Sequence, residues 1–175
     1  MSYVTITDVK IANPIGPFLA PFAFEITLEC IAELKDDLEF KVIYVSSPSN
    51  KAKDQVLEQV SVGPIPLGIN RFTLEAPAPN PALIPTSDLL GCTVVSLQVS
   101  YMDCEFVRIG YLVNIEHPEL VAAAAAATAA GLEPPTTLPG GQQPKADDLV
   151  RNILADKPRV TRFHLNWENP KDKYY

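Results

Sequence analysis

Apolar and polar side chains alternate with a period of two through much of residues 1–116, and this pattern constrains the fold more than any other feature of the chain. The segment 22–31 is the clearest example, because Phe22, Phe24 and Ile26 stand at alternate positions with residues such as Glu25 between them. This alternation is typical of a β-strand with one face in a core and the other in solvent. Further strands are expected at residues 4–11, 38–46, 55–62 and 71–76, and two more across residues 91–114.

Turn signals recur about every ten residues between these segments, which favours short antiparallel strands. The proline-rich stretch 76–85, APAPNPALIP, cannot donate regular ladder hydrogen bonds and is expected to cross between two sheets as a loop. Roughly seven such strands predict an all-β chain folded as an immunoglobulin-like β-sandwich, with short helices in the connections and near the C-terminus. The Cys…Trp…Cys pattern of antibody domains is absent from the sequence.

Charge and cysteine content limit the partners and the compartment of the protein. The formal net charge is −7, and the first 120 residues carry most of the acidic side chains. Such a body repels phosphate backbones, so a basic protein is the expected partner and direct nucleic-acid binding is not. The odd number of cysteines, three, and the absence of a signal peptide indicate a reduced, intracellular protein. No apolar run approaches the about 18 residues of a membrane span, so no membrane role is expected.

The composition changes after Glu116. The alanine-rich stretch that follows is expected to extend a helix starting near Pro118, until glycine and proline residues break regular structure. Residues 121–144 are interpreted as a low-complexity insertion within a single domain of residues 1–167, and residues 168–175 as a polar tail.

Regular structure is expected again before the tail. Asp147 or Asp148 is a suitable cap for a short helix through Leu154, which Pro158 would end. A last strand or extended segment is expected from about Val160 to Trp167, and it would tie the C-terminus back to the sandwich.

Residues 91–114 indicate two strands joined at Met102 and Asp103, and their alternation separates a core face from an outer face. The expected core set of the hairpin is Thr93, Val95, Leu97, Val99, Tyr101, Val107, Ile109, Tyr111 and Val113. The outer set then includes Val94, Phe106, Arg108 and Leu112.

The grouping on this outer face is unusual, although a single exposed apolar residue is not. Val94 and Leu112 can lie near Arg108, and Val45 of another strand in the same sheet also points outward. With acids in nearby loops, this surface suits an amphipathic helix that has apolar and basic side chains. The alternative is that the last segment or the alanine-rich insertion covers the apolar residues in cis.

No motif for catalysis or for a metal is present. His117 and His164 are far apart, and no cysteine or histidine stands at the spacing of a zinc site. No glycine-rich phosphate loop precedes a helix. The acidic turn at Asp36 and Asp37 lacks the neighbours that would raise a carboxyl pKa for acid catalysis. The chain is therefore expected not to be an enzyme and to need neither a cofactor nor a metal.

Several long segments resemble one family, the anti-silencing-function histone chaperones. The resemblance is collinear from about Val4 to Trp167 and is broken only by the insertion. The matching segments are NPIGPFLAPFAFEITLECI, LEFKVIYVSS, DQVLEQVSVGPIPLG, APAPNPALIP, EFVRIGYLVN and RNILADKPRVTRFHLNW. The resemblance implies an elongated immunoglobulin-like sandwich that binds the histone H3–H4 heterodimer during nucleosome assembly and disassembly, without ATP or metal. It also implies a monomeric nuclear protein that can shuttle from the cytoplasm with new histones and exchange them with other assembly factors.

The resemblance also assigns residues to histone contacts. Val94 would be the apolar centre that receives a helix of H3, and this occupation would block H3–H3 pairing, so that the chaperone holds a dimer. The implied H3-binding set is Val45, Asp54, Asp88, Val94, Arg108, Tyr111, Leu112 and Arg159. The C-terminal tail of H4 would add as a strand near Pro158, Val160 and Thr161. Leu112 replaces an aromatic residue of the family and Ser96 a larger aliphatic one, which implies a smaller apolar contact.

A second site is implied for basic and apolar peptides of downstream assembly factors. Its carboxylates would pair with lysine or arginine side chains of the peptide. The implied residues are Asp36, Asp37, Glu39, Lys41, Val62 and Phe72. The alternative function is an immunoglobulin-like adaptor that acts mainly through this peptide groove.

Overall fold

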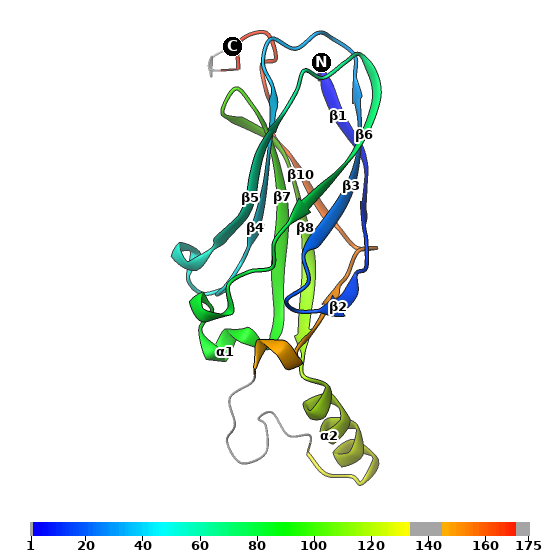
Figure 1. Ribbon diagram of the computed structural model, residues 1–175, viewed down its shortest axis with the longest axis vertical. Helices are drawn as coiled ribbons and strands as arrows, with labels where there is room; N and C mark the ends of the chain where they lie inside the picture. Colours follow the sequence, from blue (N-terminus) through cyan, green and yellow to red (C-terminus); the bar gives the residue numbers. More distant parts are fainter. Residues whose placement is uncertain (1, 134–144, 171–175) are drawn as a thin grey trace.

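The computed structural model describes residues 2–133 and 145–170, apart from the side chains of Thr86 and Ser87, and in it two antiparallel sheets pack face to face (Figure 1). The three-stranded sheet has the order β1 (Val4–Ile11), β3 (Phe22–Cys30), β6 (Gly68–Ala76). The seven-stranded sheet has the order β2 (Ile15–Pro17), β9 (Val150–Ile153), β8 (Cys104–Glu116), β7 (Gly91–Tyr101), β4 (Leu38–Tyr44), β5 (Gln55–Val62), and β10 (Arg159–Arg162) also pairs with β8. The predicted all-β, immunoglobulin-like sandwich is confirmed.

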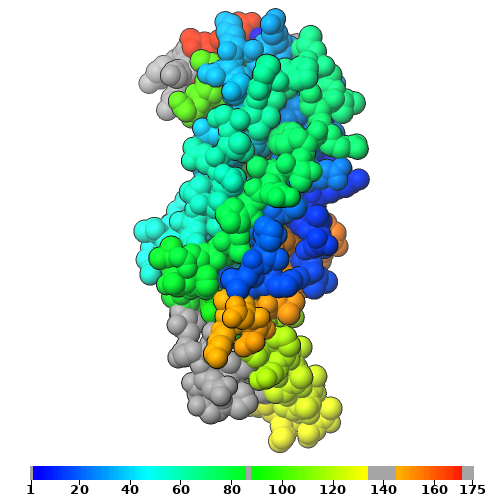
Figure 2. Space-filling model, in the orientation of Figure 1, coloured from blue at the N-terminus to red at the C-terminus, as the bar shows by residue number. Residues whose placement is uncertain are grey.

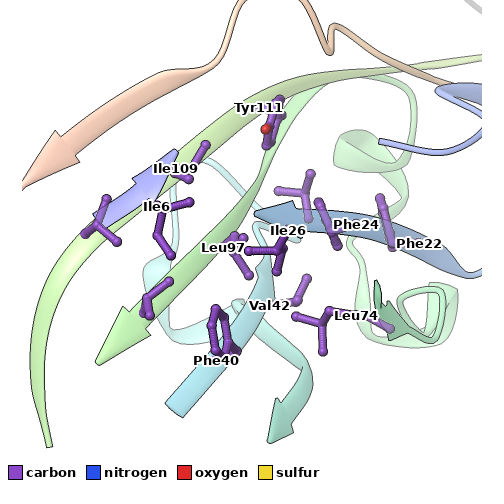
Figure 3. Close-up of a cluster of buried hydrophobic side chains, with 14 of the residues drawn as sticks. Ile6, Phe22, Phe24, Ile26, Phe40, Val42, Leu74, Leu97, Ile109 and Tyr111 are labelled. Atoms are coloured by element: carbon purple, nitrogen blue, oxygen red, sulfur yellow. The ribbon is translucent and has the colours of Figure 1, made fainter. Parts of the chain in front are cut away.

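Alternation along each strand fills the space between the sheets. In β3 the side chains of Phe22, Phe24 and Ile26 are at most 1% exposed, and the residues between them are half-buried. Figure 3 shows Phe24 and Ile26 among core side chains that include Leu97 and Tyr111 of the other sheet. Burying a large apolar side chain stabilises the fold by about 1.5–3 kcal/mol, so this shared core holds the two sheets together.

The hairpin of β7 and β8 turns where the sequence predicted, at Met102 and Asp103, which have positive φ angles of 50° and 66°. Two consecutive left-handed residues are typical of a tight hairpin turn. Beyond the turn the register shifts, because Val99 pairs with Val107 while Ser100 pairs with Glu105. Phe106 is the extra residue of this β-bulge. The expectation that Phe106 lies outside is therefore wrong: its side chain is buried, with its ring 4.7 Å from that of Trp167.

The segment after Lys145 corrects a second expectation. The predicted helix through Leu154 is reduced to a single 3-10 turn, Ala146–Asp148, and the chain then enters β9. β9 pairs with β8 on one side and with β2 on the other. Arg151 and Ile153 are buried while the residues beside them are half-buried, so the segment fits a strand once a sheet edge is available. The ladder hydrogen bonds outweigh the local helix signal.

Buried Arg151 fixes how β9 meets the start of the chain. Its guanidinium donates hydrogen bonds to the backbone oxygens of Phe18, Ala20 and Pro21 at 3.2, 2.8 and 3.2 Å. It also lies 3.7 Å from the ring centroid of Phe22. Burial lowers the pKa of Arg151 to about 10, and the side chain holds the turn between β2 and β3 against β9.

The short helices lie in connections, as expected: Lys51–Lys53, Pro81–Leu83, α1 (Thr86–Leu89) and the turn before β9. The predicted alanine-rich helix is confirmed as α2 (Pro118–Ala129), none of whose residues is buried. It follows β8 and forms one end of the elongated molecule (Figure 2). Residues 134–144 of the predicted insertion and 171–175 of the predicted tail lie outside the described residues. No helix of the described part is long and apolar enough to cross a membrane.

Candidate functional site

Three apolar side chains form a row across the outer face of the seven-stranded sheet. Val94 of β7 is directly opposite Leu112 of β8. Val45, which follows β4, donates its backbone N–H to the oxygen of Val94 at 2.9 Å, so it continues the row on the other side. We call Val45, Val94 and Leu112 the apolar row. Leu112 remains 48% exposed, so the described part of the chain does not cover it in cis.

Beside the apolar row the outer face of the sheet has little side-chain bulk, because Ser96 and Gly110 stand there. In the next row of the sheet, Ser96 is opposite Gly110, and Gly110 is opposite Arg159 of β10. A Cβ atom on Gly110 would lie 3.7 Å from a methyl carbon of Val94 and 3.9 Å from the backbone oxygen of Arg159. A glycine inside a strand often marks a place where another backbone approaches closely. The apolar row and Gly110 together therefore suit a helix lying across the sheet.

Two acidic residues lie in the loops near this end of the sheet. Asp54 ends the helical turn Lys51–Lys53, and its Oδ1 is buried with no hydrogen-bond partner among the described residues. Desolvation raises the pKa of Asp54, and the charge of Lys51 opposes this shift. Asp88 in α1 is half-buried. An unpaired buried carboxylate oxygen is costly, and a cationic donor from a partner would relieve that cost.

Arg108 is held in place by two neighbours that the sequence did not reveal. Glu105 accepts hydrogen bonds from Nε and from one terminal nitrogen of Arg108 at 2.8 and 2.9 Å. The guanidinium carbon of Arg108 also lies 5.8 Å from the ring centroid of Phe163. The hydrogen bonds to Glu105 raise the pKa of Arg108. Residues three apart on a regular strand face opposite sides, but the bulge at Phe106 brings Glu105 and Arg108 to one face. Strict alternation does not predict this pair, because the bulge that brings the two residues together leaves no signal in that pattern.

Tyr111 requires a correction, because its side chain does not belong to the outer face. It is 1% exposed and pairs with Val95 on the core side of the hairpin. Burial, followed by the charge of Asp8, raises the pKa of Tyr111 to about 12. Tyr111 therefore cannot meet a partner beside the neighbouring Leu112, as an H3-binding side chain would. It lines a groove at the sandwich edge instead.

This groove lies between β1 and β10, and we call it the edge groove. It contains a hollow of about 200 Å³, the Tyr111 pocket, lined by residues that include Ile6, Val9, Ile109, Tyr111, Pro158 and Val160. Ile6 and Ile109 lie beside one another at its base (Figure 3). Among the described residues β10 pairs only with β8, along one side, which leaves its other backbone edge available to an added strand. Pro158 and Val160 therefore meet in one pocket, whereas Thr161 and Arg159 lie on the outer face.

The second predicted site is brought together at the opposite edge of the seven-stranded sheet. Asp36 accepts a hydrogen bond from the backbone N–H of Asp37 at 2.9 Å, and Glu39 accepts one from Gln59 at 3.1 Å. Val62 of β5 is opposite Leu38 at the start of β4. The ring of Phe72 is 5.1 Å from that of Phe40, which joins the two sheets here. Lys41 lies two positions beyond Glu39 on the outer face of β4, opposite Gln98.

The described residues contain no group of three or more His, Cys, Asp or Glu side chains that could hold a metal ion. Large pKa shifts occur at Tyr44, Tyr111 and Arg151, all buried: burial raises the pKa of both tyrosines and lowers that of Arg151, and the interaction between Tyr44 and Arg151 opposes the shift of each.

An immunoglobulin-like sandwich with an apolar row on its outer face, a neighbouring glycine and charged side chains around it is typical of a protein-binding module. Comparison with known families makes this class specific. The family model described as ASF1 like histone chaperone matches residues 1–168. The chain belongs to the ASF1-like histone chaperone family, as the sequence motifs indicated. It is a nuclear histone chaperone acting in nucleosome assembly, a class that is generally non-enzymatic.

Relatives of this family are similar along almost the whole chain. The chain is 44% identical over 174 residues to Histone chaperone ASF1B of Mus musculus, covering 98% of this chain and 78% of the relative. It is 46% identical over 170 residues to Histone chaperone asf1b of Xenopus tropicalis, covering 96% and 77%. It is 47% identical over 169 residues to Histone chaperone asf1 of Aspergillus oryzae, covering 97% of this chain but 54% of that longer relative.

Proposed function

We propose that this histone chaperone binds one H3–H4 heterodimer as a monomer and exchanges it with other assembly factors. The observation that carries the proposal is the apolar row on the outer face of the seven-stranded sheet, where Leu112 is exposed and Val45 and Val94 are half-buried. A helix of H3 would lie across it, with its apolar side chains over Val94 and its backbone close to Gly110. The helix surface covered in this way is then unavailable for H3–H3 pairing.

The charged surroundings support a basic helix. The buried oxygen of Asp54 would gain a cationic donor, and Asp88 would add negative charge in the same region. Arg108 and Arg159 would meet acidic or carbonyl groups on the helix margin. Arg108 is already oriented by Glu105, so less side-chain entropy is lost when it binds.

The edge groove would take the C-terminal tail of H4. The tail would add as a strand to the free edge of β10, where the backbone of Thr161 continues the ladder, and would place an apolar side chain in the Tyr111 pocket beside Pro158 and Val160. Two separate contacts, one per histone, would favour an intact heterodimer over either histone alone.

The acidic turn at Asp36, Asp37 and Glu39, with Lys41, Val62 and Phe72, would bind basic and apolar peptides of downstream factors. Because it lies at another edge from the apolar row, a factor could dock while the histones are still bound, which supports transfer between chaperones. All of these sites would belong to one domain of residues 1–167. The protein would also move from the cytoplasm to the nucleus together with new histones.

The test is Val94→Arg, analysed by size-exclusion chromatography with H3–H4. The wild type should co-elute as one chaperone with one histone dimer, and the variant should lose co-elution because an arginine is desolvated in the contact. Thr73→Arg is the matched control, since Thr73 is exposed on the three-stranded sheet. Full histone binding by a folded Val94→Arg variant would overturn the proposal.

A second candidate is the adaptor that acts mainly through the acidic turn, favoured by the clustering of Asp36, Asp37 and Glu39 near Val62. The double substitution Asp37→Ala with Glu39→Ala separates the two functions. A histone chaperone should keep H3–H4 binding and lose the basic peptide, measured by calorimetry for each partner. Loss of the peptide with no histone binding in the wild type would favour the adaptor.

A further inference from the structure

The edge groove continues beyond the Tyr111 pocket into a second hollow of about 120 Å³, which we call the Trp167 pocket. Ile6, Val107 and Arg162 line both pockets, so the two hollows are neighbours along one groove. The remaining wall of the Trp167 pocket includes Val4, Thr5, Phe106, Phe163 and Trp167. Apart from the three shared residues, the lining of the Trp167 pocket is separate from that of the Tyr111 pocket, which is the proposed site for an apolar side chain of H4.

The two pockets are separated by two to three residues along each strand that forms the groove. On β1 the Tyr111 pocket takes residues 6–9 and the Trp167 pocket residues 4–6; along β10 and its extension the ranges are 158–162 and 162–163. A strand rises by about 3.3 Å per residue and turns alternate side chains to the same side. An extended peptide beside β10 therefore presents side chains i and i+2 to the two pockets.

The Trp167 pocket has a rigid aromatic wall. Trp167 is 6% exposed, and its ring is 5.8 Å from that of Tyr3, 5.3 Å from that of Tyr101 and 4.7 Å from that of Phe106. A hollow of this volume is close in size to the cavity of about 150 Å³ that binds benzene. It can therefore receive one aromatic ring in edge or offset contact with Trp167.

Arg162 adds a cation to this wall. Its side chain is exposed and, within residues 2–133 and 145–170, pairs with no carboxylate. A guanidinium at the mouth of an aromatic pocket attracts the face of an incoming ring. An aromatic side chain fits these surroundings better than an aliphatic one of similar size.

We propose that the edge groove recognises an extended peptide by two side chains, a bulky apolar one at position i in the Tyr111 pocket and an aromatic one at position i+2 in the Trp167 pocket. This inference rests on the proposed function, because the segment in question is the one that pairs with β10. It adds a sequence requirement to that pairing, which backbone hydrogen bonds alone would not impose.

Three capped nine-residue peptides in a Ser/Thr host test the requirement. One has leucine at position 5 and phenylalanine at position 7, the second has alanine at position 7, and the third has phenylalanine at position 6. Trp167 is the only tryptophan, so its indole N–H signal in a nuclear magnetic resonance titration reports the pocket directly. The first peptide should bind about tenfold more tightly than the others, as expected for one buried ring, and should alone shift the indole signal.

Thr5→Arg places a long side chain at the mouth of the Trp167 pocket and leaves the Tyr111 pocket open. It should remove the advantage of the first peptide and keep the weaker binding of the second, whereas Thr73→Arg should change neither. Equal affinities for the three peptides, an unmoved indole signal or no binding at all would overturn the inference. If Val94→Arg still abolishes H3–H4 binding in that case, the proposed function survives. If it does not, the proposed function itself has failed.

Discussion

The two sheets of this sandwich have the same strand alternation but very different outer faces. On the three-stranded sheet the outward side chains of β3 and β6 are mainly charged or hydroxylated, and Arg71 pairs with Glu25 at 3.7 Å. On the seven-stranded sheet the apolar row crosses β8, β7 and the residue that follows β4, and it lies beside Gly110. Alternation decides which side of a strand is buried, whereas the kind of outward residue distinguishes a solvent face from a binding face.

Single exposed apolar residues also occur on the three-stranded sheet, but they do not form a continuous patch there. Ile69 of β6 is 77% exposed, more than Leu112, yet its cross-strand partner is Glu29. Leu112 instead continues a row of apolar neighbours on adjacent strands. Contiguity across strands, rather than the exposure of one side chain, separates the binding face from an ordinary surface.

The largest effect is expected for two adjacent residues of β7 that lie on opposite faces of the sheet. Val95 is completely buried, whereas the adjacent Val94 belongs to the apolar row. Val95→Asp should lower the free energy of unfolding by more than about 4 kcal/mol, because it places an unpaired charge in the core. Val94→Asp should stay within about 1 kcal/mol of the wild type and lose histone binding. Urea unfolding and histone pull-down measure the two effects, and equal stabilities for the two variants would contradict the assigned faces.

Gly110→Leu should come next in size and should act on binding alone. A side chain at this position fills the low surface where a helix backbone would lie, so H3–H4 affinity should fall about tenfold or more. The fold should tolerate it, because the nearest atoms to the new Cβ are at ordinary contact distances. Calorimetric titration checks the affinity and thermal unfolding the stability. An unchanged affinity would show that no helix approaches Gly110.

Breaking the ion pair on each face should give a smaller difference. Glu105→Gln releases Arg108 and should weaken H3–H4 binding several-fold, with a loss of stability within the about 0.2–1 kcal/mol typical of exposed pairs. Glu25→Gln breaks the pair with Arg71 on the other face and should leave histone binding unchanged. Affinities at low and high salt separate orientation of Arg108 from simple charge. If the two variants behave alike, Glu105 does not position Arg108.

The smallest effect concerns the pH dependence of stability at Asp54. Its pKa is raised in the folded protein, so the folded state binds more protons than the unfolded state between the two pKa values. Stability should therefore fall as the pH rises through that acidic window, and the cost should persist at neutral pH. Asp54→Asn should remove this cost and slightly raise the melting temperature at pH 7, while Asp156→Asn at an exposed position should not. A lower melting temperature for Asp54→Asn would contradict the desolvation of Asp54.

Much of the fold could be predicted because its signals are local. The alternation of β3, the turn at Met102 and the start of α2 at Pro118 all follow from residues a few positions apart. The strand β9 could not be predicted in this way. Its four residues have a weak local pattern, and β2 and β8, which pair with it, are distant in sequence.

The residues of the candidate site also fall into those that local alternation predicts and those that depend on tertiary structure. Val94, Arg108 and Leu112 were placed on one face by counting alternate positions, and the structure keeps them there. Tyr111 was assigned to H3 binding by resemblance, although counting alternate positions already put it in the core, where the structure has it. Glu105 is brought to Arg108 by a bulge and Phe163 by the distant segment that follows β10, and neither leaves a pattern in the neighbouring residues.

The sequence by itself determined the class of fold, the two sides of each strand and the family, because periodicity and motif identity are properties of consecutive residues. Only the tertiary structure decided which strand edges stay free, how the bulge turns Phe106 inward and where Trp167 closes the edge groove. Those features depend on which segments from different parts of the chain compete for the same hydrogen bonds and the same apolar space, and no local pattern records the outcome of that competition.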